Sequence, residues 1–169
     1  MDRDDRFEAL YRTYAGRVRG YALRRTSSSA ADDVVAEVFL VAWRRLDDVP
    51  DDVFPWLLGV ARRILANRRR SEQRAGALID QLADQLRSTS SLDPGDERAL
   101  RALARLSDRD QELLFLAVWE ELDNSGLAQV LGIRKGAVAV RLHRARRRLA
   151  AALAVEDAPE AIPVVEVPR

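Results

Sequence analysis

Residues 123–153 read DNSGLAQVLGIRKGAVAVRLHRARRRLAAAL, and this stretch decides the fold of the C-terminal half of the chain. Asp123 or Asn124 can cap a short helix, and Gly132 can end it because glycine adopts the positive φ of a tight turn. A second helix is expected after Ile133 because apolar residues return there at helical spacing. Its inward stripe consists of Val138, Leu142, Ala145 and Leu149. Two short helices joined at a glycine predict a helix-turn-helix.

The outward positions of the second helix are basic, and no acidic residue is interleaved with them. They are Arg134, Lys135, Arg141, Arg144, Arg146, Arg147 and Arg148. Cationic side chains this close together repel one another along a helix. Binding to the phosphate groups of a nucleic acid would offset that repulsion. The alternative is a solvated basic face, but such faces normally interleave acids. We therefore interpret the segment as a DNA-reading element.

The expected DNA contacts divide by their position on this helix. Its N-terminal turn should enter the major groove, where the residues that meet base edges or flanking phosphates are Arg134, Lys135, Ala137, Val138 and Arg141. The residues further along, which should hold the backbone, are Arg144, Arg146 and Arg147. His143 is the only histidine of the chain, so it can form neither a metal site nor a catalytic triad with others of its kind.

Composition limits the other classes of function. The 169 residues allow one ordinary domain or two small ones, and the absence of cysteine excludes disulfides and thiolate metal sites. The net charge is only +1, so affinity for nucleic acid must come from local segregation of charge. With no phosphate-cradling glycine loop, we expect no catalytic residue, metal or cofactor.

The chain shows no sign of a membrane or secretory segment. No stretch approaches the run of roughly 18 apolar residues that a membrane span needs. The N-terminus, MDRDDRFEAL, is too charged for a signal peptide. We expect a cytoplasmic protein.

The N-terminal half predicts three helices. Apolar residues from Phe7 to Tyr21 recur at spacings of three and four, which predicts a helix to about Arg25. A second helix should follow the polar break at residues 26–29, with Asp32 and Asp33 in its first turn. The segment 47–55 holds four aspartates and two prolines, which predicts a loop. A third helix should begin near Pro55 and end in basic residues.

The remaining segments complete an all-α fold of two small helical domains, since no strand-like alternation is present. Leu78 to Leu86 can support a short helix within a weakly patterned linker. Further helices are expected from Glu97 to Leu106 and after Ser107, which can cap a helix with Asp110 three positions on. The predicted parts are a first domain at 1–72, a linker at 73–96, a second domain at 97–154 and a flexible tail at 155–169.

Three motifs resemble those of the extracytoplasmic-function (ECF) sigma factors, and they cover nearly all of the chain. LGIRKGAVAVRLHRARRRL, residues 131–149, is similar to region 4, whose usual form is close to LGIS-x-GTV-x-SRLHRARRRL. AADDVVAEVFLVAW, residues 30–43, resembles region 2.2, and FPWLLGVARRILANRRR, residues 54–70, resembles regions 2.3 to 2.4. The motifs stand in the family's order.

The resemblance implies a promoter-specificity subunit of bacterial RNA polymerase. Residues implied to dock on the polymerase core are Asp32, Asp33, Val35, Glu37, Phe39 and Trp43. Residues implied to open and hold the minus-ten element, together with the loop at 47–54, are Trp56, Arg62, Arg63, Asn67 and Arg69. Region 4 would read the minus-thirty-five element through the basic helix. The implied partners are core polymerase and promoter DNA, and family members often add an anti-sigma protein.

Simpler interpretations stay open for single residues and for the chain. Burial preferences favour packing over contact for the aromatic residues Phe39, Trp43, Trp56 and Trp119. Gly126 stands where the family usually has glutamate, so the first helix of the helix-turn-helix is expected to start later or be looser.

The competing functions are a stand-alone helix-turn-helix regulator that works without polymerase and an α-helical adaptor that binds RNA or another acidic partner.

Overall fold

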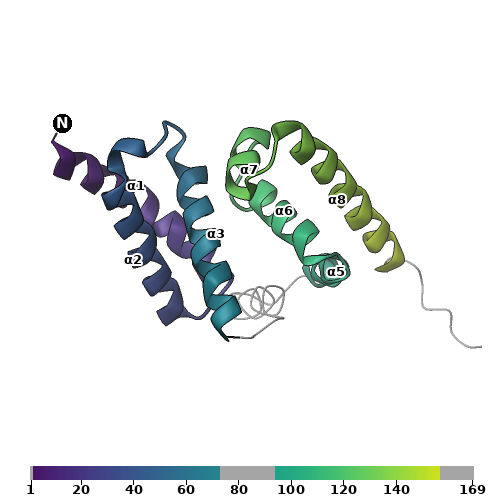
Figure 1. The fold of residues 1–169 in the computed structure, drawn as a ribbon. Helices are drawn as coiled ribbons and strands as arrows, with labels where there is room; N and C mark the ends of the chain where they lie inside the picture. The colour runs from purple at the N-terminus through teal and green to yellow at the C-terminus, as the bar shows by residue number, and fades with distance from the viewer. Residues whose placement is uncertain (1, 73–93, 157–169) are drawn as a thin grey trace, which may run out of the picture.

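The computed structural model describes residues 2–72 and 94–156. Helices are the only regular structure within those ranges, which confirms the predicted all-α fold. Figure 1 shows them as two groups side by side, an N-terminal unit of α1 to α3 and a C-terminal unit of α5 to α8. The short helix expected between Leu78 and Leu86 lies outside the described residues, as does the tail from 157. No described helix combines the length and the apolar character needed to cross a bilayer.

The N-terminal unit begins at a strong helix cap. Its elements are α1 (Arg3–Leu23), α2 (Ser28–Arg44), a 3-10 turn (Leu46–Asp48) and α3 (Val53–Glu72). Asp2 and Asp5 form a capping box, so α1 begins four residues before the first apolar position of the predicted stripe. Because α2 begins at Ser28, Asp32 and Asp33 lie in its second turn, and their predicted place in the first turn is wrong.

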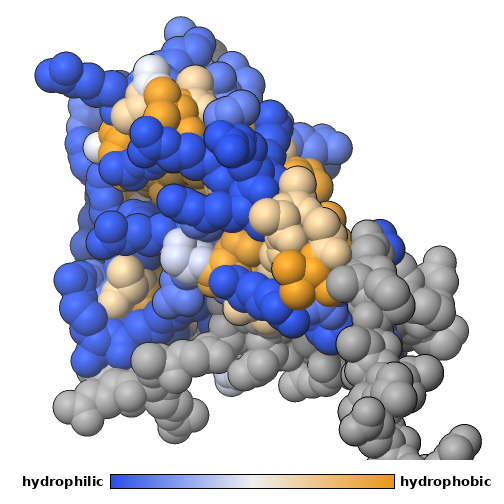
Figure 2. Space-filling view, turned by 90° about the vertical axis from the view of Figure 1, so that its right-hand side faces the viewer, coloured by the Kyte–Doolittle hydropathy of each residue, from blue (hydrophilic) through white to orange (hydrophobic). Residues whose placement is uncertain are grey.

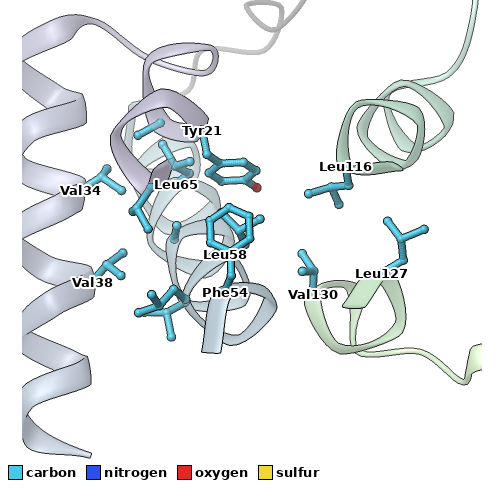
Figure 3. Close-up of a cluster of buried hydrophobic side chains, with 14 of the residues drawn as sticks. Tyr21, Val34, Val38, Phe54, Leu58, Leu65, Leu116, Leu127 and Val130 are labelled. Carbon is cyan, nitrogen blue, oxygen red and sulfur yellow. The ribbon is translucent and has the colours of Figure 1, made fainter. Parts of the chain in front are cut away.

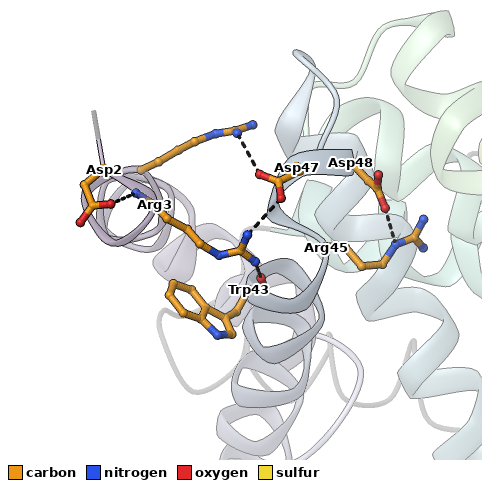
Figure 4. A network of polar contacts seen from close by, with 7 residues as sticks. Asp2, Arg3, Trp43, Arg45, Asp47 and Asp48 are labelled. Carbon is orange, nitrogen blue, oxygen red and sulfur yellow. Dashed lines mark hydrogen bonds and ion pairs between the residues drawn. The ribbon is translucent and has the colours of Figure 1, made fainter.

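The acidic loop after α2 is tied to the start of α1. Arg3 donates to the carboxylate of Asp47 at 3.0 Å and to the carbonyl oxygen of Trp43 at 2.8 Å. Its guanidinium also lies 5.2 Å from the centre of the Trp43 ring. Figure 4 shows this network, in which Arg45 also pairs with Asp48 at 3.5 Å. The first part of the loop is therefore held by ion pairs on the surface.

The C-terminal unit follows the predicted caps closely. Its helices are α5 (Pro94–Ala104), α6 (Asp108–Val118), α7 (Asn124–Leu131) and α8 (Lys135–Glu156). The Ser107 side chain accepts from the backbone N–H of Asp110, as expected for its cap. Asp123 caps α7, and Gly132 ends it with a φ of 66°. Both signals read from the sequence are confirmed.

The end of α8 extends past the predicted boundary at 154. Glu156 pairs with Arg101 at 2.9 Å and with Arg105 at 2.7 Å, so its side chain joins α8 to α5. The hydrogen bond from Arg101 is the main reason that the pKa of Glu156 is lowered. Val155 and Glu156 are therefore helical, and their assignment to the tail is wrong.

The two units pack against each other through α3, α6 and α7. Figure 3 shows Tyr21, Phe54 and Leu58 of the N-terminal unit facing Leu116, Leu127 and Val130 of the C-terminal unit. These side chains are all buried. The helix backbones lie close together at Gly59 of α3, where a Cβ would be in ordinary van der Waals contact with the Cα of Val130 on α7, at 3.8 Å.

Gly126 lies in the first turn of α7, at this interface. The helix starts at Asn124, before Gly126, so the expected later start is wrong. The Gly126 N–H donates to the Asp123 carboxylate at 2.8 Å, which places glycine in a well-capped first turn. A Cβ at this position would lie 3.1 Å from Cγ of Pro55 on α3. A larger residue would collide with the other unit.

We expect Gly126→Glu to separate the two units, because the added side chain would meet Pro55 and its charge would have to be buried. The measurement is small-angle X-ray scattering of the full chain, which should show a larger radius of gyration. Ser125→Glu, an exposed position on the same helix, is the control and should scatter like the wild type. Equal radii for wild type and Gly126→Glu would contradict this account of the interface.

Candidate nucleic-acid interface

The α7–turn–α8 segment has the geometry of a helix-turn-helix with a clear division between its two faces. The inward stripe of α8 is as predicted: Val138, Leu142 and Ala145 are buried, and Leu149 is half-buried. Val138 and Leu142 join the same apolar core as Leu127 and Val130 of α7. Packing of this stripe fixes which residues of α8 face solvent.

The residues predicted to contact the DNA backbone are exposed to solvent. The exposed cationic residues of α8 and of the turn before it are Arg134, Lys135, Arg141, Arg144, Arg146, Arg147 and Arg148. Among the described residues, an acid pairs with only one of these, Arg148, which lies 2.6 Å from Asp110 of α6. Figure 2 faces the side on which α8 lies and shows hydrophilic residues over most of it, with separate apolar patches. Repulsion among unpaired cations leaves this surface suited to phosphate.

The burial of Val138 and the exposure of Val140 differ from the contacts predicted for α8. Val138 has no exposed surface, so its predicted contact with a base edge is wrong, because it belongs to the core that joins α8 to α7. Ala137 is half-buried. Val140, which the sequence analysis did not select, is 50% exposed beside Arg141. Helical spacing places Val140 outside the inward stripe, and this property of the sequence could have identified it as an exposed residue.

The residues predicted for the minus-ten element are not equally accessible. Arg63, Asn67 and Arg69 are exposed along α3, and Trp56 is half-buried. Arg62 instead makes a two-point contact with Glu112 of α6, at 2.8 and 3.1 Å. The hydrogen bond to Glu112 raises the pKa of Arg62. In this arrangement the other unit covers Arg62.

The residues predicted to dock on polymerase form two groups. The acids are exposed but paired within the chain: Asp32 with Arg19 at 2.7 Å, and both Asp33 and Glu37 with Arg68.

The apolar residues of the same predicted surface are mostly internal. Val35 is 8% exposed and Phe39 is 3% exposed, so neither presents a surface to a partner in this fold. Phe39 packs against the rings of Phe7 and Tyr11, which confirms the packing interpretation for this residue. Trp43 is half-buried. Their neighbours Tyr11 and Leu40 are the exposed apolar residues of this face, at 45% and 48%.

Trp119 differs from the other aromatic residues. It was expected to be packed in α6, but it is 44% exposed and touches Phe115 with a ring-centre distance of 5.4 Å. It follows the last residue of α6, so the helix no longer directs it into the core.

A cationic cluster at the junction of the two units was missed by sequence reasoning. It consists of Arg17, Arg24, Arg25 and Arg62 of the N-terminal unit. Arg24 pairs with Glu120, which is 5% exposed, and Arg17 donates to the Glu120 carbonyl oxygen at 3.5 Å. Helical periodicity gives no signal for these contacts, because the partners are about a hundred residues apart.

Comparison with known proteins identifies both halves of the chain. The family model described as Sigma-70 region 2 matches residues 10–75, and the one described as Sigma-70, region 4 matches residues 96–149. The RNA polymerase sigma factor NccH of Alcaligenes xylosoxydans xylosoxydans is 30% identical over 137 residues, which are 74% of each chain. The ECF RNA polymerase sigma factor EcfG of Rhodopseudomonas palustris (strain TIE-1) is 30% identical over 151 residues, 85% of this chain and 82% of that one.

A solved structure agrees with these matches. CnrH, solved in complex with the cytosolic domain of CnrY, has a TM-score of 0.62 and is 26% identical. The similarity covers 90% of this chain and 89% of CnrH.

We expect Val138→Ala to lower the free energy of unfolding by about 2 kcal/mol, because it removes fully buried methyl groups from the junction of α7 and α8. Val140→Ala, at an exposed position two residues away, should change it by less than about 0.5 kcal/mol. Urea denaturation followed by circular dichroism measures both. If the two variants were equally stable, Val138 would not have the core position assigned to it.

Proposed function

The chain belongs to the extracytoplasmic-function RNA polymerase sigma factors of the sigma-70 family, and on that basis we propose which of its residues carry each step of promoter recognition. A sigma factor directs the bacterial RNA polymerase core to promoters and starts transcription there. Such factors are initiation factors, and we assign no catalytic residue to this chain. Its place of action is that of core polymerase, the bacterial cytoplasm. The domains are region 2 at 1–72 and region 4 at 97–154, the latter with α8 extended to Glu156.

The exposed, unpaired cations of α8 carry the proposal. The first turns of α8 enter the major groove of the minus-thirty-five element, where Arg134, Lys135 and Arg141 reach base edges and flanking phosphates. Arg144, Arg146 and Arg147 hold the DNA backbone further along. Ala137 offers only a methyl group, so base reading rests on arginine and apolar contact with thymine.

The exposed basic side of α3 holds the minus-ten strand. Arg63 and Arg69 supply cations along the backbone, Asn67 supplies an amide, and Trp56 stands near the acidic loop. Arg62 joins them once Glu112 has released it.

The surface of α2 docks on the polymerase core. Asp32, Asp33 and Glu37 present exposed carboxylates, which can exchange their partners within the chain for cations of the polymerase. Trp43, Leu40 and Tyr11 add apolar area beside them.

Another protein can hold the factor inactive. The similar protein CnrH was solved with the cytosolic domain of CnrY bound to it. We infer that an anti-sigma protein would be the corresponding partner of this chain.

Reconstituted run-off transcription over a library of genomic promoters tests the function directly. The full chain added to bacterial core polymerase should give promoter-dependent transcripts that core alone does not give. Sequence-specific duplex binding by the free chain, with no effect on core polymerase, would instead indicate the stand-alone helix-turn-helix regulator. Equal affinity for RNA and DNA, again with no transcript, would indicate the adaptor.

Arg141→Ala should weaken binding of the reconstituted holoenzyme to its promoter, because an exposed guanidinium on the groove-facing side of α8 is lost. The slope of log affinity against log salt should fall by about 0.9 for one lost phosphate contact. Filter binding over a series of salt concentrations measures both quantities.

Arg148→Ala is the matched control for Arg141→Ala. It removes a guanidinium that Asp110 already neutralises, so the slope should change less. An unchanged slope for Arg141→Ala would show that this residue does not contact phosphate.

A further inference from the structure

In the structure the two units are packed together, an arrangement called closed below. The junction between them holds more cationic than anionic side chains. The N-terminal unit contributes four guanidinium groups, those of Arg17, Arg24, Arg25 and Arg62. The acids that face them from the C-terminal unit are two, Glu112 and Glu120. Two acids against four cations leave a local excess of two positive charges.

Arg25 shows the imbalance most clearly. It is 6% exposed, its guanidinium lies 3.6 Å from the centre of the Tyr21 ring, and one nitrogen donates to the Tyr21 carbonyl oxygen at 2.9 Å. Its Nη2 has no hydrogen-bond partner, and neither has the hydroxyl of Tyr21. Burial without a carboxylate partner lowers the pKa of Arg25. A buried cation without a carboxylate partner costs free energy in this arrangement, and an anion that reached it would relieve that cost.

Aromatic rings adjoin the cations. The Arg17 guanidinium lies 3.6 Å from the centre of the Phe54 ring, and Tyr14 stacks on the same ring at 5.9 Å with an angle of 14° between the planes. Phe54 lies in the first turn of α3, and Arg62 lies two turns further along the same helix. Cations that follow a backbone beside aromatic rings suit single-stranded DNA.

Glu112 and Glu120 supply the anionic side chains that face these arginines. Glu112 contacts Arg62 at two points, as a phosphate can. Glu120 pairs with Arg24 through its carboxylate and accepts from Arg17 through its backbone carbonyl oxygen. Both carboxylates come from the unit that carries the duplex-reading helix. An open chain would expose the guanidinium groups to any anion of suitable shape.

We propose that Arg17, Arg24 and Arg25 extend the α3 surface into a binding site for the phosphate backbone of single-stranded DNA, and that Glu112 and Glu120 occupy this site in the closed chain. The site rests on the proposed function, because it lengthens the path of the melted strand from α3 onto α1. Closure and strand binding then exclude each other. The chain by itself binds single strands weakly, and separation of the units creates the full site.

Binding of fluorescent oligothymidine to the full chain tests this site by anisotropy. Glu112→Gln/Glu120→Gln removes both competing carboxylates and should tighten binding about tenfold. The slope of log affinity against log salt should steepen by about 2 to 3, the value for up to four new phosphate contacts on a single strand. Adding Arg24→Gln to this variant should reverse most of the gain.

Glu121→Gln is the control for each single substitution, since Glu121 is exposed next to Glu120 and its loss changes the net charge by one, half the change in the double variant. The proposal is overturned if the double variant binds oligothymidine no more tightly than two such neutral substitutions on the surface would allow, or if Arg24→Gln leaves its affinity unchanged. Should the double variant fail to fold, Glu112→Gln alone keeps the buried Arg24–Glu120 pair and should still tighten binding about threefold, with a slope steeper by about 0.7. No gain from this variant would equally overturn the proposal.

Two further results distinguish this site from an RNA-binding surface and from the sigma function itself. Tighter binding of oligouridine than of oligothymidine would overturn it in favour of an RNA surface. Run-off transcription by the wild-type chain tests the sigma function separately, so transcription with no gain in strand binding would contradict only this site.

Discussion

The contact of α3 with α6 and α7 is the interaction on which the arrangement of the whole chain depends. It buries Phe54 and Leu58 against Leu116 and Val130, and it sets Glu112 and Glu120 against arginines of the N-terminal unit. Glycine at 126 allows α7 to approach Pro55 closely. As a result the cationic side of α8 is open to solvent, while Arg62 of α3 is paired with the C-terminal unit.

The free energy that holds the two units together is limited, so they can separate again. Apolar burial stabilises it, but buried ion pairs contribute little net free energy because both charges must lose water. The unpaired guanidinium nitrogen of Arg25 opposes it. A partner that offers more anionic groups than two carboxylates, as promoter DNA does, can therefore compete with the C-terminal unit for the same arginines, and polymerase can hold the units apart.

Local signals were sufficient to predict most of the helices and the exposed cationic face of α8. The stripe through Leu142 and Ala145, the cap at Asp123 and the turn at Gly132 each depend on neighbours within a few residues. The sequence could not reveal that Glu112 covers Arg62, because no periodicity links residues 50 positions apart. Val138 shows a related limit: helical periodicity placed it in the inward stripe, its place near the start of the helix put it among the groove contacts, and packing against α7 decides for the core.

The separation of the two units can be measured in the free chain and in the promoter complex. The chain has no cysteine, so spin labels can be attached at Ser29→Cys on α2 and Ala104→Cys on α5, both exposed. Double electron–electron resonance should give one short distance for the free chain and a longer one after core polymerase and promoter DNA are added. The same distance in both states would contradict an account in which the arginines covered by Glu112 and Glu120 are released to hold DNA.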